Sequence, residues 1–202
     1  MAMTMPVMAR ISPMPDAPRY LQNHFLIALP GMDDPNFAGG VTLLCHHAAE
    51  GAMGLMLNRL APLTLGDVFE QMGIKTFDLE LAQSPVLLGG PVQCDRGFVL
   101  HTPDGGEWES TFPVSEHLRL TTSRDVLEAI AKGNGPRNSV VALGYAGWGE
   151  HQLEEEIQDN AWLTVEADPS VIFDTPLEQR WNAATRLIGI DPRLLAGYAG
   201  HA

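Results

Sequence analysis

Few cysteines, few basic residues and no long hydrophobic run characterise this chain of 202 residues. Its two cysteines, Cys45 and Cys94, form no Cys-x-x-Cys pair. Two cysteines in a chain of this length do not make a disulfide framework. Without the close pair, a zinc ribbon or a thioredoxin-like redox site also loses its main support. The expected compartment is therefore a reducing cytoplasm.

No hydrophobic run approaches the ~20 residues that a membrane-spanning helix needs, so we expect no membrane segment. Residues 1–19 are rich in methionine and proline, and they lack the basic start and long apolar stretch of a secretory signal. We expect them to form a mobile tail. Residues 20–202 suit one domain, because 45% hydrophobic and 18% charged residues are ordinary for a chain with a true core.

Basic residues are outnumbered: 12 Lys and Arg stand against 25 Asp and Glu, for a net charge of -13. Phosphate backbones repel such a surface, so a sequence-independent grip on nucleic acid is disfavoured. The densest acidic stretch contains no basic residue and consists of Glu150, Glu154, Glu155, Glu156 and Asp159. It is interpreted first as a solvated helix face. The alternative is a docking face for a basic partner.

Strand-like runs dominate the first half of the chain. They lie at residues 24–29, 41–47, 52–59, 85–88, 97–102 and 118–121. A helix is expected over residues 65–72, with Thr64 as its N-cap and Gly73 as its stop. Another is expected from a cap at Thr175 to about residue 188. Because helices are few and no GxGxxG follows the first strand, the pattern favours an α+β fold with a mostly antiparallel or mixed sheet.

Residues 144–163 combine a glycine-rich turn with a helical pattern. The turn holds Gly144, Gly147 and Gly149. Glycines let the backbone come close to a neighbouring element or to a ligand. Backbone N–H groups at such a turn can also hold an anion, although the glutamates that follow place negative charge at the same helix end. Tight packing of a helix on a sheet is the simpler interpretation.

The helix expected after this turn carries two neighbouring stripes at four-residue spacing. The apolar stripe consists of Leu153, Ile157 and Ala161. The polar stripe consists of Gln152, Glu156 and Asn160. Polar side chains beside a core stripe commonly anchor a helix through hydrogen bonds to nearby loops. The alternative is the polar wall of a small pocket, with Trp148 as its aromatic floor.

Five segments occur in a fixed order along the chain. They are Leu-Gln-Asn-His-Phe-Leu-Ile-Ala at 21–28, Gly-Ala-Met-Gly-Leu-Met-Leu-Asn-Arg at 51–59, Leu-Gly-Gly-Pro at 88–91, Asp-Arg-Gly-Phe-Val-Leu-His-Thr-Pro at 95–103, and residues 144–162. Together they resemble the AlgH/YqgE family of bacterial proteins, and the match covers about residues 20–202. The resemblance implies an α+β fold whose sheet is barrel-like and bifurcated.

The resemblance says less about activity. The family is uncharacterised in molecular terms, and its best-known label is that of a transcriptional regulator linked to alginate production. The chain departs from similar sequences at His151, where a small residue is often found. A small residue at position 151 would allow a closer approach of the backbone than histidine allows.

Cys45 and His47 are the most reactive neighbours in the sequence. They lie two residues apart in an expected strand, so both are predicted to face one side of it. Such a pair could act as a thiolate nucleophile or as half of a metal site. The other candidate ligands, His24, Cys94 and His101, lie far apart in the sequence. A buried cysteine beside a hydrogen-bonded histidine is the simpler interpretation, and we expect neither metal nor cofactor.

Candidate ligand-binding residues gather at glycine turns and strand ends. They are Asn58, Arg59, Gly89, Gly90, Arg96, Gly147, Trp148, Gln152 and Asn160. Arg59 could hold a carboxylate with two guanidinium nitrogens, or it could be a strand-end charge facing water. Arg96, beside Asp95, could clamp a ligand or stabilise a turn. We expect the glycine turns to enclose one hollow.

The leading hypothesis is a cytoplasmic, non-enzymatic binding or regulatory module that acts through a protein partner or a small ligand. One alternative is a hydrolase-like enzyme that uses Cys45 and His47, or carboxylates. No Gly-x-Ser-x-Gly or His-Glu-x-x-His motif supports it. Another alternative is a DNA-binding regulator, which follows only from the family label. The acidic composition and the lack of a basic recognition helix argue against it.

Overall fold

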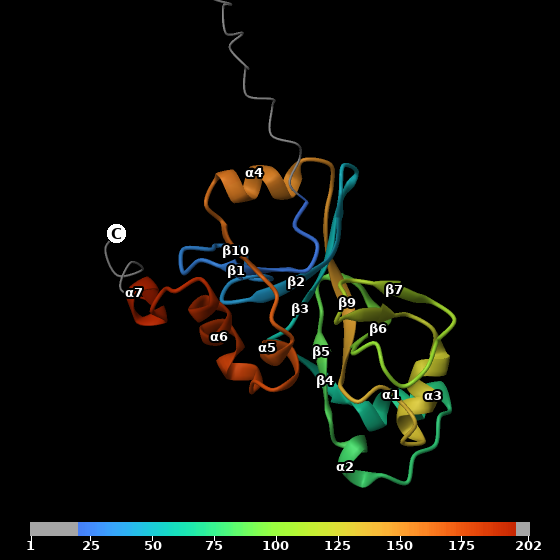
Figure 1. Ribbon diagram of the computed structural model, residues 1–202. Helices are drawn as coiled ribbons and strands as arrows, with labels where there is room; N and C mark the ends of the chain where they lie inside the picture. Colours follow the sequence, from blue (N-terminus) through green and yellow to red (C-terminus); the bar gives the residue numbers. More distant parts are fainter. Residues whose placement is uncertain (1–19, 197–202) are drawn as a thin grey trace, which may run out of the picture.

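Ten strands form a curled, half-barrel sheet in the computed structural model, which describes residues 20–196 (Figure 1). The expected tail over residues 1–19 lies outside the described residues. The strands are β1 (His24–Ala28), β2 (Val41–Ala48), β3 (Gly51–Met56), β4 (Leu60–Thr64), β5 (Pro85–Leu88), β6 (Val92–His101), β7 (Thr111–Pro113), β8 (Arg119–Thr121), β9 (Ser139–Trp148) and β10 (Trp162–Glu166).

Short helices cover this sheet. They are α1 (Leu65–Met72), α2 (Leu79–Ala82), α3 (Arg124–Ala131), α4 (Gln152–Gln158), α5 (Pro169–Phe173), α6 (Arg180–Leu187) and α7 (Pro192–Ala196), with a 3-10 turn at Leu177–Gln179. Figure 1 shows α4 at one end of the sheet, α5 to α7 beside β1 and β10, and α1 to α3 at the opposite end. Within residues 20–196, no helix is both long and apolar enough to cross a membrane.

The sheet divides at β9. The main path runs β10-β1-β2-β3-β9-β6-β8-β7, while β4 and β5 form a branch beside β9. Along one edge, β9 pairs with β6. Along its other edge, β9 first pairs in parallel with β5 and then, from Ala146 onward, antiparallel with β3. The expected α+β class with a mixed, bifurcated sheet is confirmed.

Three apolar clusters hold the helices on the sheet. In one, α5 and α6 pack against β1, β2 and β3, and Ile172 is fully buried. In another, α1 and α3 cover β5, β6 and β9 through residues such as Phe69. In the remaining cluster, α4 buries Leu153 against β1, β2 and β9. These three groups of helices therefore cover different parts of the curled sheet.

The local signals at α1 are confirmed. Thr64 and Asp67 form a reciprocal capping box, and Gly73 ends the helix with a φ of 67°. The predicted cap at Thr175 is wrong. Its hydroxyl donates instead to the carbonyl of Ser170, and α6 begins only at Arg180 after a 3-10 turn. Some elements were not predicted from the sequence, such as β4, β7, α2 and α5, and each of these has five residues or fewer.

Backbone meets backbone where the sheet divides. A Cβ atom on Gly90 would lie 2.1 Å from the carbonyl carbon of Tyr145, and one on Gly89 would lie 2.4 Å from the carbonyl oxygen of Gly144. Gly144 itself has a φ of 73°, and its own Cβ would lie 2.5 Å from the carbonyl oxygen of Gly90. No side chain fits at these positions, so the junction requires glycine on both chain segments.

We expect Gly90→Ala to destabilise the protein by about 1–3 kcal/mol, because the added methyl group must push two strands apart. Gly97→Ala is the matched control in the same strand region. Nothing lies within 4 Å of its added Cβ, and the expected change is within about 0.5 kcal/mol. The midpoint of urea unfolding measures both effects. Equal midpoints for the two variants would contradict the proposed role of the junction.

Candidate functional site

The structure does not gather the candidate ligand-binding residues around one hollow. Asn58 and Arg59 instead hold the loop between β1 and β2. The side-chain amide of Asn58 donates to the carbonyl oxygen of Gly39 at 2.9 Å. The guanidinium of Arg59 donates to the carbonyl oxygens of Pro35 at 2.8 Å and Ala38 at 2.9 Å. These polar groups are used within the fold.

The glycine turn at Gly89 and Gly90 is also approached closely by another part of the backbone. The space beside it is filled by the backbone of Gly144 and Tyr145. The expectation of a close backbone approach is therefore correct, and neither glycine lines any of the cavities described below. The neighbouring element, rather than a ligand, is what the glycines accommodate.

Glu156 is the centre of the polar stripe on α4. Its carboxylate accepts hydrogen bonds from the indole N–H groups of Trp148 at 3.0 Å and Trp162 at 2.8 Å, and from the side chain of Gln152 at 3.0 Å. Trp148 is 5% exposed. The stripe therefore anchors α4 over the sheet, and Trp148 is not the open floor of a pocket. The sequence pointed to this stripe but left its central carboxylate out of the candidate set.

The turn before α4 also satisfies its own hydrogen bonds. The backbone N–H of Gly149 donates to the Oε1 atom of Gln152 at 3.0 Å, so it does not need an anion. Gly147 lies in β9, paired with Met53. Asn160 lies beyond the end of α4, with a φ of 58°, and does not share the site of Trp148 and Gln152.

Cys45 and His47 do not form a pair. The pairing of β2 with β3 shifts between Leu44 and His46, and this bulge reverses the expected alternation of side chains. Cys45 lies in the apolar core with Leu43. The imidazole of His47 accepts from the backbone N–H of Leu21 at 2.8 Å and contacts the carboxylate of Glu154 at 2.8 Å. The prediction that both side chains share one face is wrong.

Cys45 and His47 also lie in different chemical environments. Burial raises the pKa of the Cys45 thiol to about 12, so the reactive thiolate is scarce at neutral pH. His47 is 5% exposed and fastens β2 to α4 through Glu154. Within residues 20–196, no cluster of three His, Cys, Asp or Glu residues is arranged to hold a metal ion.

His101 is a buried histidine with two hydrogen-bond partners. Its Nδ1 atom lies 2.7 Å from the carbonyl oxygen of Thr102, and its Nε2 atom lies 2.7 Å from the hydroxyl of Thr121. Burial lowers the pKa of His101, which favours the neutral ring. In that form Nδ1–H donates to the carbonyl and Nε2 accepts from the hydroxyl. His101 thus ties β6 to β8, and it also lines a cavity of about 340 Å³ together with Trp108 and Arg119.

A cavity of about 730 Å³ opens between β2 and β3 on one side and β6 to β8 on the other. We call it the Arg96 cavity. Its lining is formed by Gln22, Cys45, His46, Met53, Arg96, Phe98, Phe112, Pro113, Val114, Leu120, Thr122 and Tyr145. Arg96 is the candidate ligand-binding residue that reaches it. Asn160 lines a separate cavity, of about 640 Å³, at the end of the β1–β10 pair.

Arg96 is held over an aromatic floor. Its guanidinium carbon lies 5.5 Å from the ring centroid of Phe98, which in turn packs edge-on against Tyr145. Its contact with the side chain of Gln93 is long, at 3.5 Å. Within residues 20–196, no carboxylate forms an ion pair with Arg96. A positive charge thus stands at the edge of a largely apolar cavity.

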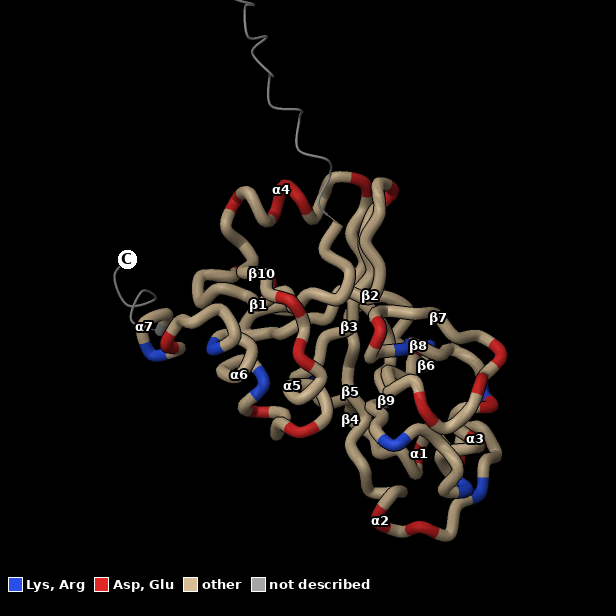
Figure 2. The backbone as a smooth tube through the Cα atoms, in the orientation of Figure 1, with Lys and Arg blue, Asp and Glu red and all other residues tan. Residues whose placement is uncertain are grey.

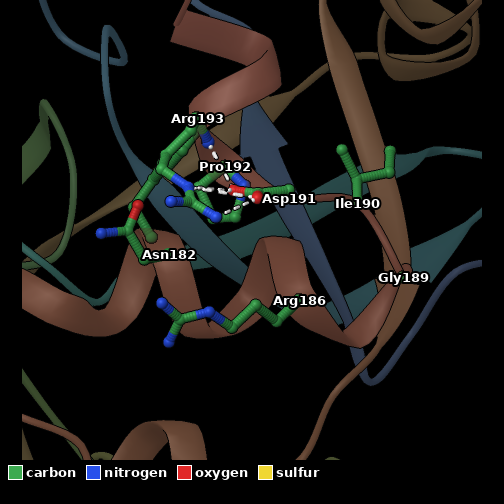
Figure 3. Close-up of a pocket in the computed structure, with 8 residues that line it drawn as sticks. Asn182, Arg186, Gly189, Ile190, Asp191, Pro192 and Arg193 are labelled. Atoms are coloured by element: carbon green, nitrogen blue, oxygen red, sulfur yellow. Dashed lines mark hydrogen bonds and ion pairs between the residues drawn. The ribbon is translucent and has the colours of Figure 1, made fainter.

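A further cavity, of about 610 Å³, lies between α6 and α7. Figure 3 shows Arg193 turned onto Asp191, with their closest atoms 2.7 Å apart. The hydrogen bonds from Arg193 lower the pKa of Asp191 to about 2. These two charges neutralise each other, but Arg186 also lines this cavity, so the Arg96 cavity is distinguished by its apolar and aromatic lining rather than by its charge alone.

Cys45 should resist thiol reagents in the folded protein, whereas the exposed Cys94 should react. With a pKa of about 12, on the order of 10⁻⁴ of the Cys45 thiol is ionised at pH 8, and burial also blocks access. Ellman's reagent should therefore titrate one thiol before unfolding and two in guanidinium. In Cys94→Ser the early reaction should disappear. Rapid labelling of Cys45 in that variant would contradict the assignment.

His151 occupies a strained backbone position. It is the residue before α4 and adopts a φ of 62°, in the left-handed region. His151→Gly should therefore stabilise the protein by about 0.5–1 kcal/mol, since glycine avoids the strain but loses more entropy on folding. His151→Ala is the control, because alanine keeps the strain and should bring no gain. Thermal unfolding distinguishes the two variants, and equal melting temperatures would argue against strain at this turn.

Comparisons with known proteins agree with this fold. The family model described as AlgH-like matches residues 25–193. A UPF0301 protein of Thioalkalivibrio sulfidiphilus is 55% identical over 180 residues, covering 89% of this chain and 96% of that protein. One from Nitrosococcus oceani is 50% identical over 183 residues, covering 91% and 97%.

Solved structures give the same result. The solution structure of the AlgH protein from Pseudomonas aeruginosa superposes with a TM-score of 0.75 at 49% identity, covering 94% of this chain and 100% of that one. A crystal structure of a Corynebacterium diphtheriae protein has a TM-score of 0.69, covering 93% and 95%, and its 20% identity bears on the fold alone. The resemblance noted in the sequence is confirmed, and the chain belongs to the AlgH-like family.

Proposed function

We propose that this chain is a non-enzymatic binding module of the cytoplasm and that the Arg96 cavity is its ligand site. The observation that carries the proposal is the position of Arg96, an arginine without an ion-pair partner among residues 20–196, at the edge of an apolar cavity of about 730 Å³. That volume lies within the range of about 300–1,000 Å³ typical of small-molecule sites. The ligand would be a small organic anion with an apolar body.

The lining suits such a ligand. Met53, Phe98 and Tyr145 supply an apolar and aromatic surface, and the guanidinium of Arg96 can bind a carboxylate with two parallel hydrogen bonds. A ligand of this kind would bury its apolar body against the aromatic rings and leave its charge at the opening. Both features favour organic carboxylates over inorganic anions.

Binding is better supported than catalysis by the cysteine and histidine pair. Cys45 lies at the cavity wall, but burial raises the pKa of its thiol to about 12. The imidazole of His47 is engaged with Leu21 and Glu154, so it is not positioned to accept the thiol proton. The free thiols of Cys45 and Cys94 also fit a reducing compartment.

Regulation, if the family label applies here, would act through a ligand or a protein partner rather than through direct contact with DNA. The net charge of -13 opposes a phosphate backbone. Arg96 presents a single positive charge at a cavity, whereas DNA-binding surfaces carry basic residues along a helix or a stripe. The proposed regulator is therefore one that responds to a small anion.

Titration with 3-phenylpropionate, a small aromatic carboxylate, tests the site. In two-dimensional NMR spectra of the native protein, we expect shifts of the backbone amides of Met53, Phe98 and Tyr145. Arg96→Gln should weaken binding at least about tenfold, which corresponds to the ~1.4 kcal/mol within reach of one charged hydrogen-bonding pair. Lys75→Gln, which removes an exposed positive charge elsewhere, should leave the affinity unchanged.

The neutral analogue 3-phenylpropanol separates charge from apolar contact. The alcohol should bind the native protein about as weakly as the carboxylate binds the Arg96→Gln variant. The Arg96→Gln substitution should not weaken binding of the alcohol. If the alcohol binds the native protein as tightly as the carboxylate does, or if the shifts lie away from the cavity, the proposed site is wrong.

A further inference from the structure

The two edge strands of the sheet, β7 and β10, are protected to different degrees against pairing with a further strand. At one end, β7 has three residues, and its Pro113 has no N–H group to offer to another strand. The carbonyl oxygen of Pro113 also lies 3.3 Å from the side-chain amide of Gln22. At the other end, β10 has five residues and contains neither proline nor lysine. Short edge strands, proline and lysine are the usual protection against strand addition, and only β7 has any of them.

The pairing of β10 with β1 shows which of its backbone groups point outward. Residues of an antiparallel pair alternate between those that exchange hydrogen bonds with the partner strand and those that face away from it. The bonds from Leu29 N–H to the carbonyl of Ala161 and from Ala167 N–H to the carbonyl of Asn23 fix this alternation. The outward N–H and C=O groups belong to Trp162, Thr164 and Glu166.

Within residues 20–196, no strand pairs with this outer edge of β10, which forms its ladder with β1 alone. Backbone N–H and C=O groups arranged in a row are a template for another strand. We propose that β10 accepts an extended segment of a protein partner as an added strand, and that this segment carries lysine or arginine side chains.

The charge around β10 selects this kind of segment. Between Arg137 and Arg180 the chain contains no lysine or arginine. Three exposed acidic residues are Glu155 in α4, Asp159 at the end of α4 and Glu166 in β10. Figure 2 shows acidic positions along α4 and along the segment from β10 to α5. A second copy of this chain is a poorer occupant, because two molecules of net charge -13 repel each other.

A receiving cavity lies at the start of the same strand. It has a volume of about 640 Å³ and is lined by Leu29, Met32 and Ala161, with Asp33 and Asp159 also contributing. An apolar lining with two carboxylates suits a long basic side chain, which buries its methylene groups and keeps its charge at the opening. The backbone edge would provide affinity, and this cavity would provide selectivity.

Amide hydrogen exchange on the full chain tests whether the edge is open. The N–H groups of Leu163 and Val165 bond to β1 and should exchange slowly, whereas those of Thr164 and Glu166 should exchange at least tenfold faster. This alternation should not depend on protein concentration. Slow exchange at all four positions in dilute protein would show that the edge is already covered. Protection that grows with concentration would identify a second copy as the occupant, and either result overturns the proposal.

Peptide titration tests the proposed partner. An octapeptide that alternates lysine with valine should shift the amides of Trp162, Thr164 and Glu166 and should slow exchange at Thr164 and Glu166. A glutamate and valine peptide should bind at least tenfold more weakly. A version of the basic peptide with N-methylated backbone amides should also lose at least tenfold in affinity, since it cannot donate to the strand.

Substitutions in the protein complete the test. Thr164→Pro removes an outward N–H without removing a bond to β1, and it should weaken the lysine peptide at least tenfold. Thr164→Ala, which keeps the N–H, should bind like the native protein. Asp159→Asn should reduce affinity for the lysine peptide alone. Should Thr164→Pro fail to fold, the N-methylated peptide makes the same distinction. Equal binding of the methylated and unmethylated peptides would overturn the proposal.

Discussion

The contact between Gly89–Gly90 and Gly144–Tyr145 determines the shape of the rest of the molecule. Because neither segment carries a side chain in the gap, β5 and β9 meet directly and β9 then exchanges β5 for β3. The same junction shapes β6, whose pairing with β9 passes from Tyr145 opposite Val92 to Leu143 opposite Gly97. The residues between these two points bulge from the sheet, and Arg96 is one of them. The position of the cation at its cavity is thus a consequence of the glycine junction.

The segment from Gly144 through α4 anchors that helix on the sheet. Glu156 accepts hydrogen bonds from two indoles, and the buried His47 contacts Glu154, two residues earlier in the helix. Two carboxylates of α4 are therefore committed to the sheet below it, while Glu155 on the outer face remains exposed. The half-buried carboxylate of Glu156 is satisfied by the two buried tryptophans. Glu154 and Glu156 consequently anchor the helix, while Glu155 contributes negative charge on its exposed face.

Local patterns in the sequence were enough for part of this structure. The cap at Thr64 and the stop at Gly73 depend on neighbours within a few residues, whereas the need for glycine before Pro91 comes from the distant backbone of Gly144 and Tyr145. The uses of Asn58 and Arg59 depend on a loop some twenty residues away, and a single bulge in β2 separates Cys45 from His47. No periodicity signals such a bulge, since its effect is to break the period. Arg96 was identified as a candidate, but its cavity joins strands that are distant in the sequence.

The two proposed sites are linked by the short segment that leads into β1. Gln22 lines the Arg96 cavity, and its side chain donates to the carbonyl of Val114 at 3.1 Å. Two residues later the chain enters β1, where His24 pairs with Glu166 of β10. A ligand in the cavity and a strand at the β10 edge would therefore act on the same short segment. Any effect of the ligand on strand binding must be matched by an equal effect of the strand on ligand binding, because coupling free energy is reciprocal. That reciprocity is the physical basis on which this AlgH-like domain could regulate a partner.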